Sequence, residues 1–266
     1  MAATNKASVA FDANTVVVIT GSSRGLGFGL VKGILETTDS KVVATARNVA
    51  KASALSELQA KYPDRVQLVN LDTGSEDSIK AAAAEVAKHH DGIDLLFNNA
   101  GIDEGVDACC LDVPVSKYEE ILKINVLGPF TMTTNFLPLL RKKQSRVVVN
   151  MSSGLASIST NRLYISDPEK MPLGNRWIAY NSSKAALNMQ TSVFANQLKD
   201  EGFCVVALNP GWVNTDMGGA NARKLGMEKA PMDTETSITM QLKVLQGLTT
   251  KSNGQFLSYD NKHIDD

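Results

Sequence analysis

The chain of 266 residues has few cysteines, almost no net charge and no long apolar run. Its three cysteines, Cys109, Cys110 and Cys204, are odd in number and two are adjacent, which does not fit a disulfide framework. We expect them to be small buried hydrophobic residues. No apolar stretch reaches the ~18 residues of a membrane-spanning helix. A formal net charge of −1 and a pI near 6.3 argue against nucleic acid or an anionic membrane as a partner.

Histidine is also scarce, and the positions of His89, His90 and His263 exclude two further kinds of site. The three histidines and the cysteines lack metal-ligand spacing, so we predict no metal site. No Gly-x-Ser-x-Gly elbow accompanies them, which argues against a hydrolase triad. The first and last residues carry no recognisable targeting signal, so a cytoplasmic location is expected.

Short β-branched runs alternate with longer helical stretches along the chain. Strands are expected at residues 16–20, 41–46, 66–70, 95–97, 146–151, 204–208 and 255–257. Helices are expected at residues 25–36, 75–89, 116–140, 179–199 and 234–247. Continuously apolar strands suit a parallel sheet covered on both faces, and the alternation indicates βαβ crossovers. The pattern therefore predicts an α/β fold: one Rossmann domain over residues 1–266, with a doubly wound, mostly parallel, seven-stranded sheet.

Within this domain, residues 12–150 are expected to form mainly the cofactor half and residues 151–266 the catalytic and substrate half. Segments 160–176 and 216–232 look irregular and fall near the ligand-bearing edge of the sheet, so we expect two loops that wall the substrate site. Their apolar side chains favour an apolar or aromatic substrate, although packing against each other or another subunit explains them equally well. These side chains are Leu155, Ile158, Leu163, Tyr164, Trp177, Trp212, Met217 and Met227.

A glycine-rich loop follows the first expected strand and opens a helix. Its glycines are Gly21, Gly25 and Gly27. Glycines allow the backbone to approach a pyrophosphate, and a helix N-terminus supplies amide donors and a positive dipole end. The loop therefore predicts a dinucleotide site, with contacts from these glycines and from Ser23, Arg24 and Leu26.

The end of the second strand decides which dinucleotide is expected. NAD sites usually place an acidic residue there, but this strand ends at Arg47 with no acid nearby. Arg24 adds a second cation, and a guanidinium matches a phosphate in shape and charge. We therefore predict NADP, with Arg24 and Arg47 at the 2′-phosphate, although solvated surface arginines remain an alternative. Asp72 follows the third strand and could accept a hydrogen bond from the adenine amino group, or cap a helix.

Tyr180 and Lys184 lie four residues apart in an expected helix and so share one face. A phenol beside a fixed ammonium ionises more easily than a phenol in water. Ser152 and Ser153 precede them at the end of the fifth strand. Each feature alone has an ordinary reading as a packing contact or a turn. With a dinucleotide loop upstream, the three together indicate redox chemistry on a carbonyl or alcohol.

In this order the motifs resemble those of the short-chain dehydrogenase/reductase family over nearly the whole chain. Residues 20–27 are similar to its Thr-Gly-x-x-x-Gly-x-Gly loop and residues 98–101 to its Asn-Asn-Ala-Gly. Residues 180–184 match its Tyr-x-x-x-Lys, and residues 210–215 resemble its Pro-Gly-x-Val-x-Thr. Asn-Met-Ser-Ser-Gly at 150–154 looks closest to sniffer and C-factor-like carbonyl reductases and to fungal norsolorinic acid ketoreductase-like proteins.

The resemblance implies an NADP-dependent oxidoreductase acting on CH–OH or C=O groups. We expect it to reduce a ketone, aldehyde or quinone with NADPH. Tyr180 would donate the proton, while Lys184 would lower the pKa of Tyr180 and bind the nicotinamide ribose. Ser153, rather than Ser152, would orient the substrate oxygen, and Asn125 would hold a water of the proton relay. Further cofactor contacts are implied for Asn98, Ala100, Val213 and Thr215.

Three questions stay open at this point. The reaction could run in the oxidative direction, as in an alcohol dehydrogenase, or the chain could be a non-catalytic NADP-binding sensor. The intact Ser153, Tyr180 and Lys184 argue against a sensor, because a binding protein has no need for all three. A homo-oligomer, dimer or tetramer, is compatible with the family. However, the segment between Ser153 and Tyr180 is longer than in many family members. It lies beside the tyrosine helix, where the family usually forms a four-helix contact between subunits, and so argues against that contact.

Overall fold

A seven-stranded sheet forms the centre of the computed structural model, which describes residues 8–105, 110–166 and 176–265. Its strand order is β3-β2-β1-β4-β5-β6-β7, and all neighbouring strands are parallel. The strands are β1 Val16–Ile19, β2 Lys41–Ala46, β3 Val66–Asn70, β4 Leu95–Asn98, β5 Val147–Met151, β6 Cys204–Asn209 and β7 Phe256–Ser258. The predicted doubly wound parallel sheet is confirmed, and each strand lies within about one residue of its expected bounds.

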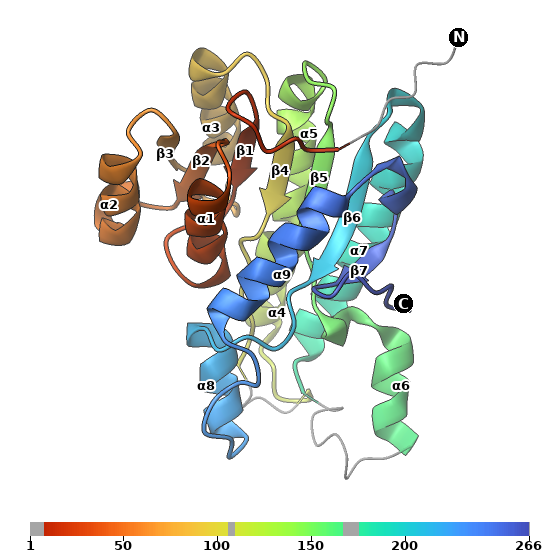
Figure 1. The fold of residues 1–266 in the computed structure, drawn as a ribbon. Helices are drawn as coiled ribbons and strands as arrows, with labels where there is room; N and C mark the ends of the chain where they lie inside the picture. The colour runs from red at the N-terminus through yellow and green to blue at the C-terminus, as the bar shows by residue number, and fades with distance from the viewer. Residues whose placement is uncertain (1–7, 106–109, 167–175, 266) are drawn as a thin grey trace.

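The described helices connect these strands and are seen in Figure 1. They are α1 Gly25–Thr37, α2 Ser53–Lys61, α3 Glu76–His89, α4 Val115–Leu122, α5 Gly128–Leu140, α6 Ile158–Ser166, α7 Ile178–Leu198, α8 Asp216–Lys224 and α9 Thr234–Gly247. Short 3₁₀ turns occupy Val49–Lys51, Gly154–Ala156, Lys199–Glu201 and Thr250–Ser252. Helices α1, α3, α7 and α9 lie where the sequence pattern places them.

The core consists of two apolar layers, one on each face of the sheet. Side chains alternate along a strand, so Val17 and Ile19 of β1 pack in one layer with α1 and with Leu242 of α9. Val18 faces the other layer, which includes Phe136 of α5 together with residues of α3 and α7. Burial on both faces is the reason why these strands read as continuous apolar runs.

Segments 160–176 and 216–232 are not simply loops, so that expectation was wrong in part. Residues 158–166 form α6, and residues 167–175 lie outside the described chain. Residues 216–224 form α8, whose first turn is capped by the hydroxyl of Thr215, which accepts from the amide of Gly218 at 3.2 Å. Acidic Asp216 in the first turn of α8 and basic side chains in its last turn complement the helix dipole.

The expected helix at 116–140 is continuous but contains a π-helical turn at Lys123–Leu127. In this turn the amide of Gly128 bonds the carbonyl of Lys123, five residues back. Pro129 explains the widening, because it has no amide to offer the carbonyl of Asn125 four residues earlier. π-Turns occur frequently at functional sites, and this one contains Asn125.

From β1 the chain builds the sheet in one direction, through β2 to β3, and from β4 it builds it in the other direction, through β5 to β7. The direction therefore switches between β1 and β4. The crossovers from β1 and from β4 therefore leave in opposite directions and open a crevice at the carboxyl ends of the strands. In doubly wound folds this is the position at which ligands bind. The fold thus brings the glycine loop after β1 next to the Asn-Asn-Ala-Gly turn after β4.

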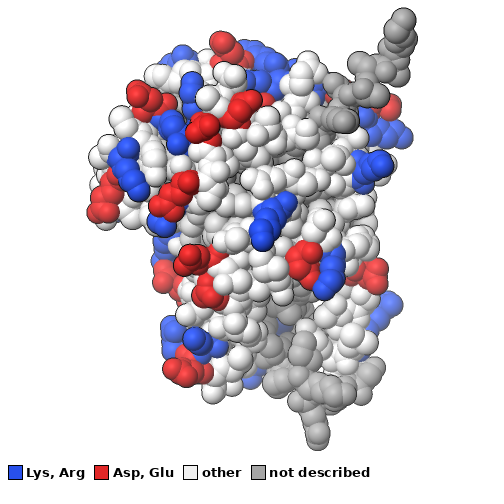
Figure 2. All heavy atoms as spheres, in the orientation of Figure 1, with Lys and Arg blue, Asp and Glu red and all other residues white. Residues whose placement is uncertain are grey.

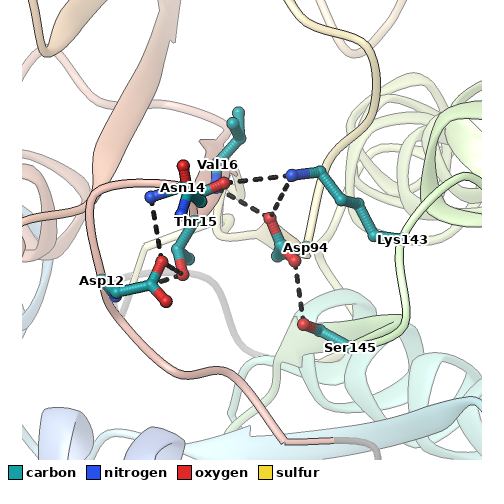
Figure 3. A network of polar contacts seen from close by, with 7 residues as sticks. All are labelled: Asp12, Asn14, Thr15, Val16, Asp94, Lys143 and Ser145. Atoms are coloured by element: carbon teal, nitrogen blue, oxygen red, sulfur yellow. Dashed lines mark hydrogen bonds and ion pairs between the residues drawn. The ribbon is translucent and has the colours of Figure 1, made fainter.

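At the amino ends of the strands, opposite the crevice, the carboxylate of Asp94 connects several segments (Figure 3). Asp94 lies directly before β4. Its Oδ2 accepts from the amide of Val16 at 2.9 Å, and its Oδ1 accepts from the hydroxyl of Ser145 at 2.8 Å. The ammonium of Lys143 lies 3.5 Å from Oδ2 and also donates to the carbonyl of Asn14. One carboxylate therefore ties together the segments that begin β1, β4 and β5.

The surface carries charges of both signs. On the face shown in Figure 2, basic and acidic side chains of the described residues are interspersed, with uncharged areas between them. This distribution agrees with the formal net charge of −1. Within the described ranges, no helix combines the length and apolarity needed to cross a bilayer.

Candidate active site

The loop between β1 and α1 needs glycine at three places. Gly21 and Gly25 have φ values of 67° and 57°, a left-handed conformation that other residues avoid. A Cβ on Gly27 would lie 2.3 Å from the carbonyl oxygen of Gly21, so no side chain fits there. Arg24 precedes α1 without a side-chain cap. The first amides of α1 are therefore available to an anionic ligand, which is the arrangement that a pyrophosphate requires.

The turn after β4 forms the second wall of the crevice, and Asn99 joins it to the glycine loop. The Asn99 side-chain amide donates to the carbonyls of Thr20 and Gly21 at 2.8 and 3.2 Å. In return, the hydroxyl of Thr20 accepts from the amides of Asn99 and Ala100, both at 2.9 Å. Neither Thr20 nor Asn99 was assigned from the sequence, although both belong to the motifs that were recognised.

Asn98, a predicted cofactor contact, is placed in the core instead. It is 3% exposed, and its side-chain amide donates to Asn150 at 2.8 Å and to Thr133 at 3.4 Å. Asn150 in turn donates to Thr191 of α7 at 2.8 Å. This chain of polar side chains links β4, β5 and α7 beneath the crevice. The motif contains two adjacent asparagines, and side chains alternate along a strand, so only the observed register could tell which one faces the ligand.

The crevice gathers most of the predicted cofactor residues. Those that line it are Gly21, Ser23, Arg24, Gly25, Leu26, Gly27, Arg47, Asp72, Ala100, Tyr180, Lys184 and Thr215. Val213 does not line it, because it is 4% exposed and pairs with Met232 in a β-bridge. Asp72 also has a structural role, since its Oδ1 accepts from the amide of Gly74 at 2.9 Å.

Arg24 and Arg47 both line the crevice. The Nη1 atom of Arg24 is 3.2 Å from the Oδ2 atom of Asp216 at the start of α8. Both side chains of this ion pair are about three-quarters exposed, at 76% and 75%. The arginine is therefore accessible to a ligand, and its guanidinium matches a phosphate in shape and charge.

Lys184 also lines the crevice, one turn after Tyr180 on α7. Its ammonium donates to the carbonyl of Met151 at 2.7 Å and lies 5.5 Å from the centre of the Tyr180 ring. The side chain is almost fully buried, and burial lowers the pKa of Lys184 to about 8. The lysine is thus held beside the phenol by a backbone bond from the end of β5.

The phenol of Tyr180 is hydrogen-bonded to the hydroxyl of Ser153. Burial nevertheless raises the pKa of Tyr180 to about 12, although the Ser153 bond lowers it and the carboxylates of Asp103 and Glu104 raise it further. The expectation of a lowered pKa was therefore wrong for the protein alone. Desolvation is the largest cause, and the ammonium of Lys184 is directed at the carbonyl of Met151.

Ser152 lies in a different environment from its neighbour. Its hydroxyl donates to Asn188 of α7 at 2.6 Å and is buried, whereas Ser153 is partly exposed beside the phenol. The two serines alternate in direction at the end of β5. The structure therefore brings Ser153, Tyr180 and Lys184 together, whereas the hydroxyl of Ser152, which also lines the crevice, is taken up by Asn188.

Asn125 is completely buried under this group. Its side chain pairs with the backbone of Ile102 in both directions, accepting from the amide at 2.9 Å and donating to the carbonyl at 2.8 Å. It also donates to the hydroxyl of Ser183 at 2.9 Å. A Cβ on Gly101 would be 3.3 Å from the Asn125 amide oxygen and 3.4 Å from the Lys184 ammonium. Asn125 therefore holds the turn after β4 against α7.

Comparisons with known proteins agree with this geometry. The sequence profile of the short chain dehydrogenase family matches residues 15–226. The chain is 34% identical to the short chain dehydrogenase gsfK of Penicillium aethiopicum, with 93% of this chain and 98% of the relative covered. It is 33% identical to an uncharacterized oxidoreductase of Schizosaccharomyces pombe, with 94% and 98% covered.

Two solved structures are similar in both sequence and fold. The NADPH-bound carbonyl reductase from chicken fatty liver has a TM-score of 0.82 and 32% identity, with 94% of this chain and 98% of that chain covered. The carbonyl reductase Sniffer of Drosophila melanogaster has a TM-score of 0.82 and 30% identity, with 95% and 99% covered. The match over residues 15–226 and these full-length relatives show that the chain belongs to the short-chain dehydrogenase family of oxidoreductases.

Proposed function

We propose that the chain is an NADPH-dependent reductase of a ketone, aldehyde or quinone carbonyl, with Tyr180 as the proton donor. One observation carries this proposal. Tyr180, bonded to Ser153, and Lys184 line the same crevice as Arg24, Arg47 and the glycine-rich start of α1. A nucleotide with its phosphates at the arginines and the helix terminus would have its reactive ring in the crevice that the phenol lines.

The residues present fit NADPH. The glycine loop and the uncapped first turn of α1 would hold the pyrophosphate, and the two arginines would hold the 2′-phosphate. Lys184 would bind the nicotinamide ribose, and Asp72, Ala100 and Thr215 line the same crevice. The bound NADPH in the chicken carbonyl reductase supports this choice. When bound, the reduced nicotinamide supplies the hydride that the carbonyl carbon receives.

The protein would supply the proton and the orientation. The hydroxyl of Ser153 would donate a hydrogen bond to the carbonyl oxygen, and the O–H bond of Tyr180 would break as its proton passes to that oxygen. The resulting tyrosinate would lie beside the Lys184 ammonium. Burial raises the pKa of Tyr180, so the phenol carries the proton that reduction consumes.

Tyr180 must regain a proton after each reduction. We propose that Asn125 holds a water on the path of that proton. Both amide hydrogens of its side chain are engaged, one with Ile102 and one with Ser183. A water would therefore bind at the main-chain carbonyl of Asn125, whose usual helical partner is Pro129.

The direct test follows NADPH oxidation with a panel of ketones, aldehydes and quinones, with NADH as the control. We expect turnover with NADPH, and a loss of at least about 100-fold in Y180F while NADPH affinity stays within about twofold. NADPH binding without turnover on any carbonyl would favour the non-catalytic sensor. Full activity in Y180F would remove the assigned role of the phenol, and preference for NADH would contradict the assignment of the arginines.

A further inference from the structure

The helix that carries Tyr180 does not cap its own N-terminus. Trp177, the residue before α7, has a left-handed backbone with a φ of 54°, and its side chain gives no capping bond within the described chain. The amides of the first helical turn have no partner inside the helix, so each needs an outside acceptor. In most helices a short polar side chain at this position fills that role.

Glu104, from the segment after β4, provides the missing acceptor. Its Oε1 accepts from the amide of Ala179 at 2.8 Å, and its Oε2 accepts from the amide of Tyr180 at 3.0 Å. The cap thus comes from 75 residues earlier in the chain and bonds the backbone of the tyrosine itself. A carboxylate is well suited to this place, because it faces the positive end of the α7 dipole.

The two residues that precede Glu104 are both anchored by hydrogen bonds. Ile102 is paired through its amide and carbonyl with the buried side chain of Asn125. The Oδ2 atom of Asp103 accepts from the side chain of Asn221 on α8 at 2.7 Å. Glu104 is therefore held in place by elements other than α7, so it can set where the first turn of α7 lies.

The charge of Glu104 also acts on the phenol. The groups that face Tyr180 are Asp103 and Glu104 from the segment after β4 and Lys184 from its own helix. Both carboxylates raise the pKa of Tyr180, in addition to the larger effect of burial. Burial is also the main cause of the raised pKa of Glu104, which its bonds to the two amides offset only in part.

We propose that Glu104 is a positioning residue for proton donation by Tyr180: its carboxylate sets the first turn of α7 against the segment after β4 and places a negative charge at the turn that carries the phenol. This inference rests on the proposed function, because it assigns Glu104 a role through Tyr180. It predicts two separable effects, one of the acceptor oxygens and one of the charge.

Two substitutions separate these effects. E104Q keeps an acceptor oxygen for the helix amides but removes the charge, and E104A removes both. D233N is the matched control, because Asp233 caps α9 with a carboxylate that accepts from the amide of Thr236 at 2.7 Å. This control makes the same carboxylate-to-amide change on a helix that carries none of the proposed catalytic residues.

The first readout is the ionisation of Tyr180, followed by NMR of protein with ¹³Cζ-labelled tyrosine and assigned with Y180F. We expect Tyr180 to ionise at a pH lower by about 0.5 or more in E104Q, because a like charge is removed. D233N should leave the titration unchanged. An unchanged titration in E104Q, or an equal shift in D233N, would overturn the proposal. This measurement does not depend on turnover, so it stands apart from the test of the proposed function.

The second readout is NADPH-dependent carbonyl reduction by the full chain. We expect E104A to lose about tenfold or more in kcat, because the donor is displaced from the reacting oxygen, with NADPH affinity within about twofold. E104Q should retain more activity than E104A at neutral pH. If E104A does not fold, the titration and the turnover of E104Q still test the role of Glu104. Equal activity of E104Q, E104A and wild type would contradict the positioning role, whereas loss of turnover in every protein, wild type included, would refute the proposed function.

Discussion

Arg24 and Asp216 face each other across the mouth of the crevice, with 3.2 Å between guanidinium nitrogen and carboxylate oxygen. Arg24 precedes α1 and Asp216 begins α8, so the pair joins the glycine loop to the helix that follows the Pro-Gly-x-Val-x-Thr motif. Gly25 and Thr215 also lie close, because a Cβ on Gly25 would be 3.7 Å from the Thr215 methyl group. An exposed pair of this kind contributes little to stability, roughly 0–1 kcal/mol.

Replacing Arg24 by alanine should weaken NADPH binding about tenfold or more and leave NADH binding nearly unchanged. The reason is that a guanidinium bonded to a phosphate contributes roughly 1.5–3 kcal/mol, and only NADPH has the 2′-phosphate. R47A should act in the same direction. Dissociation constants from cofactor fluorescence would measure both effects, and an equal loss for NADH would mean that the arginines support the loop rather than the phosphate.

Replacing Asp216 by asparagine should have the opposite effect on NADPH. The carboxylate competes with a phosphate for Arg24 and repels it, so D216N should bind NADPH about two- to fivefold more tightly. The gain should shrink at high salt, because both side chains are largely exposed. NADH affinity serves as the internal control. A loss of NADPH affinity would instead identify the ion pair as a clasp that holds α8 over the bound cofactor.

Ser153 and Ser152 form a natural pair of test and control. S153A should lower kcat by about 100-fold or more, because it removes a donor to the reacting oxygen. It should also raise the pKa of Tyr180, since the Ser153 hydrogen bond lowers that pKa. S152A removes only the buried bond to Asn188, so it should lower the free energy of unfolding by about 1 kcal/mol and change kcat little. Equal losses of kcat in both variants would show that the end of β5 acts only through its structure.

The sequence was sufficient to predict the sheet and most of the crevice. Runs such as Val16–Ile19 are apolar on both faces because helices cover both sides of the sheet, and this burial appears in the sequence as an uninterrupted pattern. The glycine loop was also predictable, since left-handed backbone and close contacts allow only glycine at Gly21, Gly25 and Gly27. In these places local chemistry determines the residue type.

Other features depend on contacts between distant segments, and no local pattern reports them. The cap on α7 comes from Glu104, 75 residues before Ala179, and lies in no recognised motif. The raised pKa of Tyr180 reflects desolvation by surrounding segments and the nearby carboxylates of Asp103 and Glu104, which the spacing to Lys184 does not show. Helix α8 was missed because Gly218 and Gly219 lower its helix propensity, while its cap and dipole favour it in the fold.

Lys184 should make the stability of the protein depend on pH. Burial holds its pKa at about 8 in the folded state, below the 10.5 of a free lysine. Between these values the unfolded chain binds a proton that the folded chain lacks, so the free energy of unfolding rises with pH in this window. A difference of this size corresponds to a rise on the order of 3 kcal/mol. K184M lacks this group, so the stability of wild type relative to K184M should increase between about pH 8 and pH 10.5.

Urea unfolding of both proteins from pH 7 to 10.5 would measure the difference, with Tyr180 present in each as a common background. A constant difference across this range would mean that Lys184 keeps its ordinary pKa in the fold, and that the ammonium beside the phenol is fully charged at every pH at which the enzyme works.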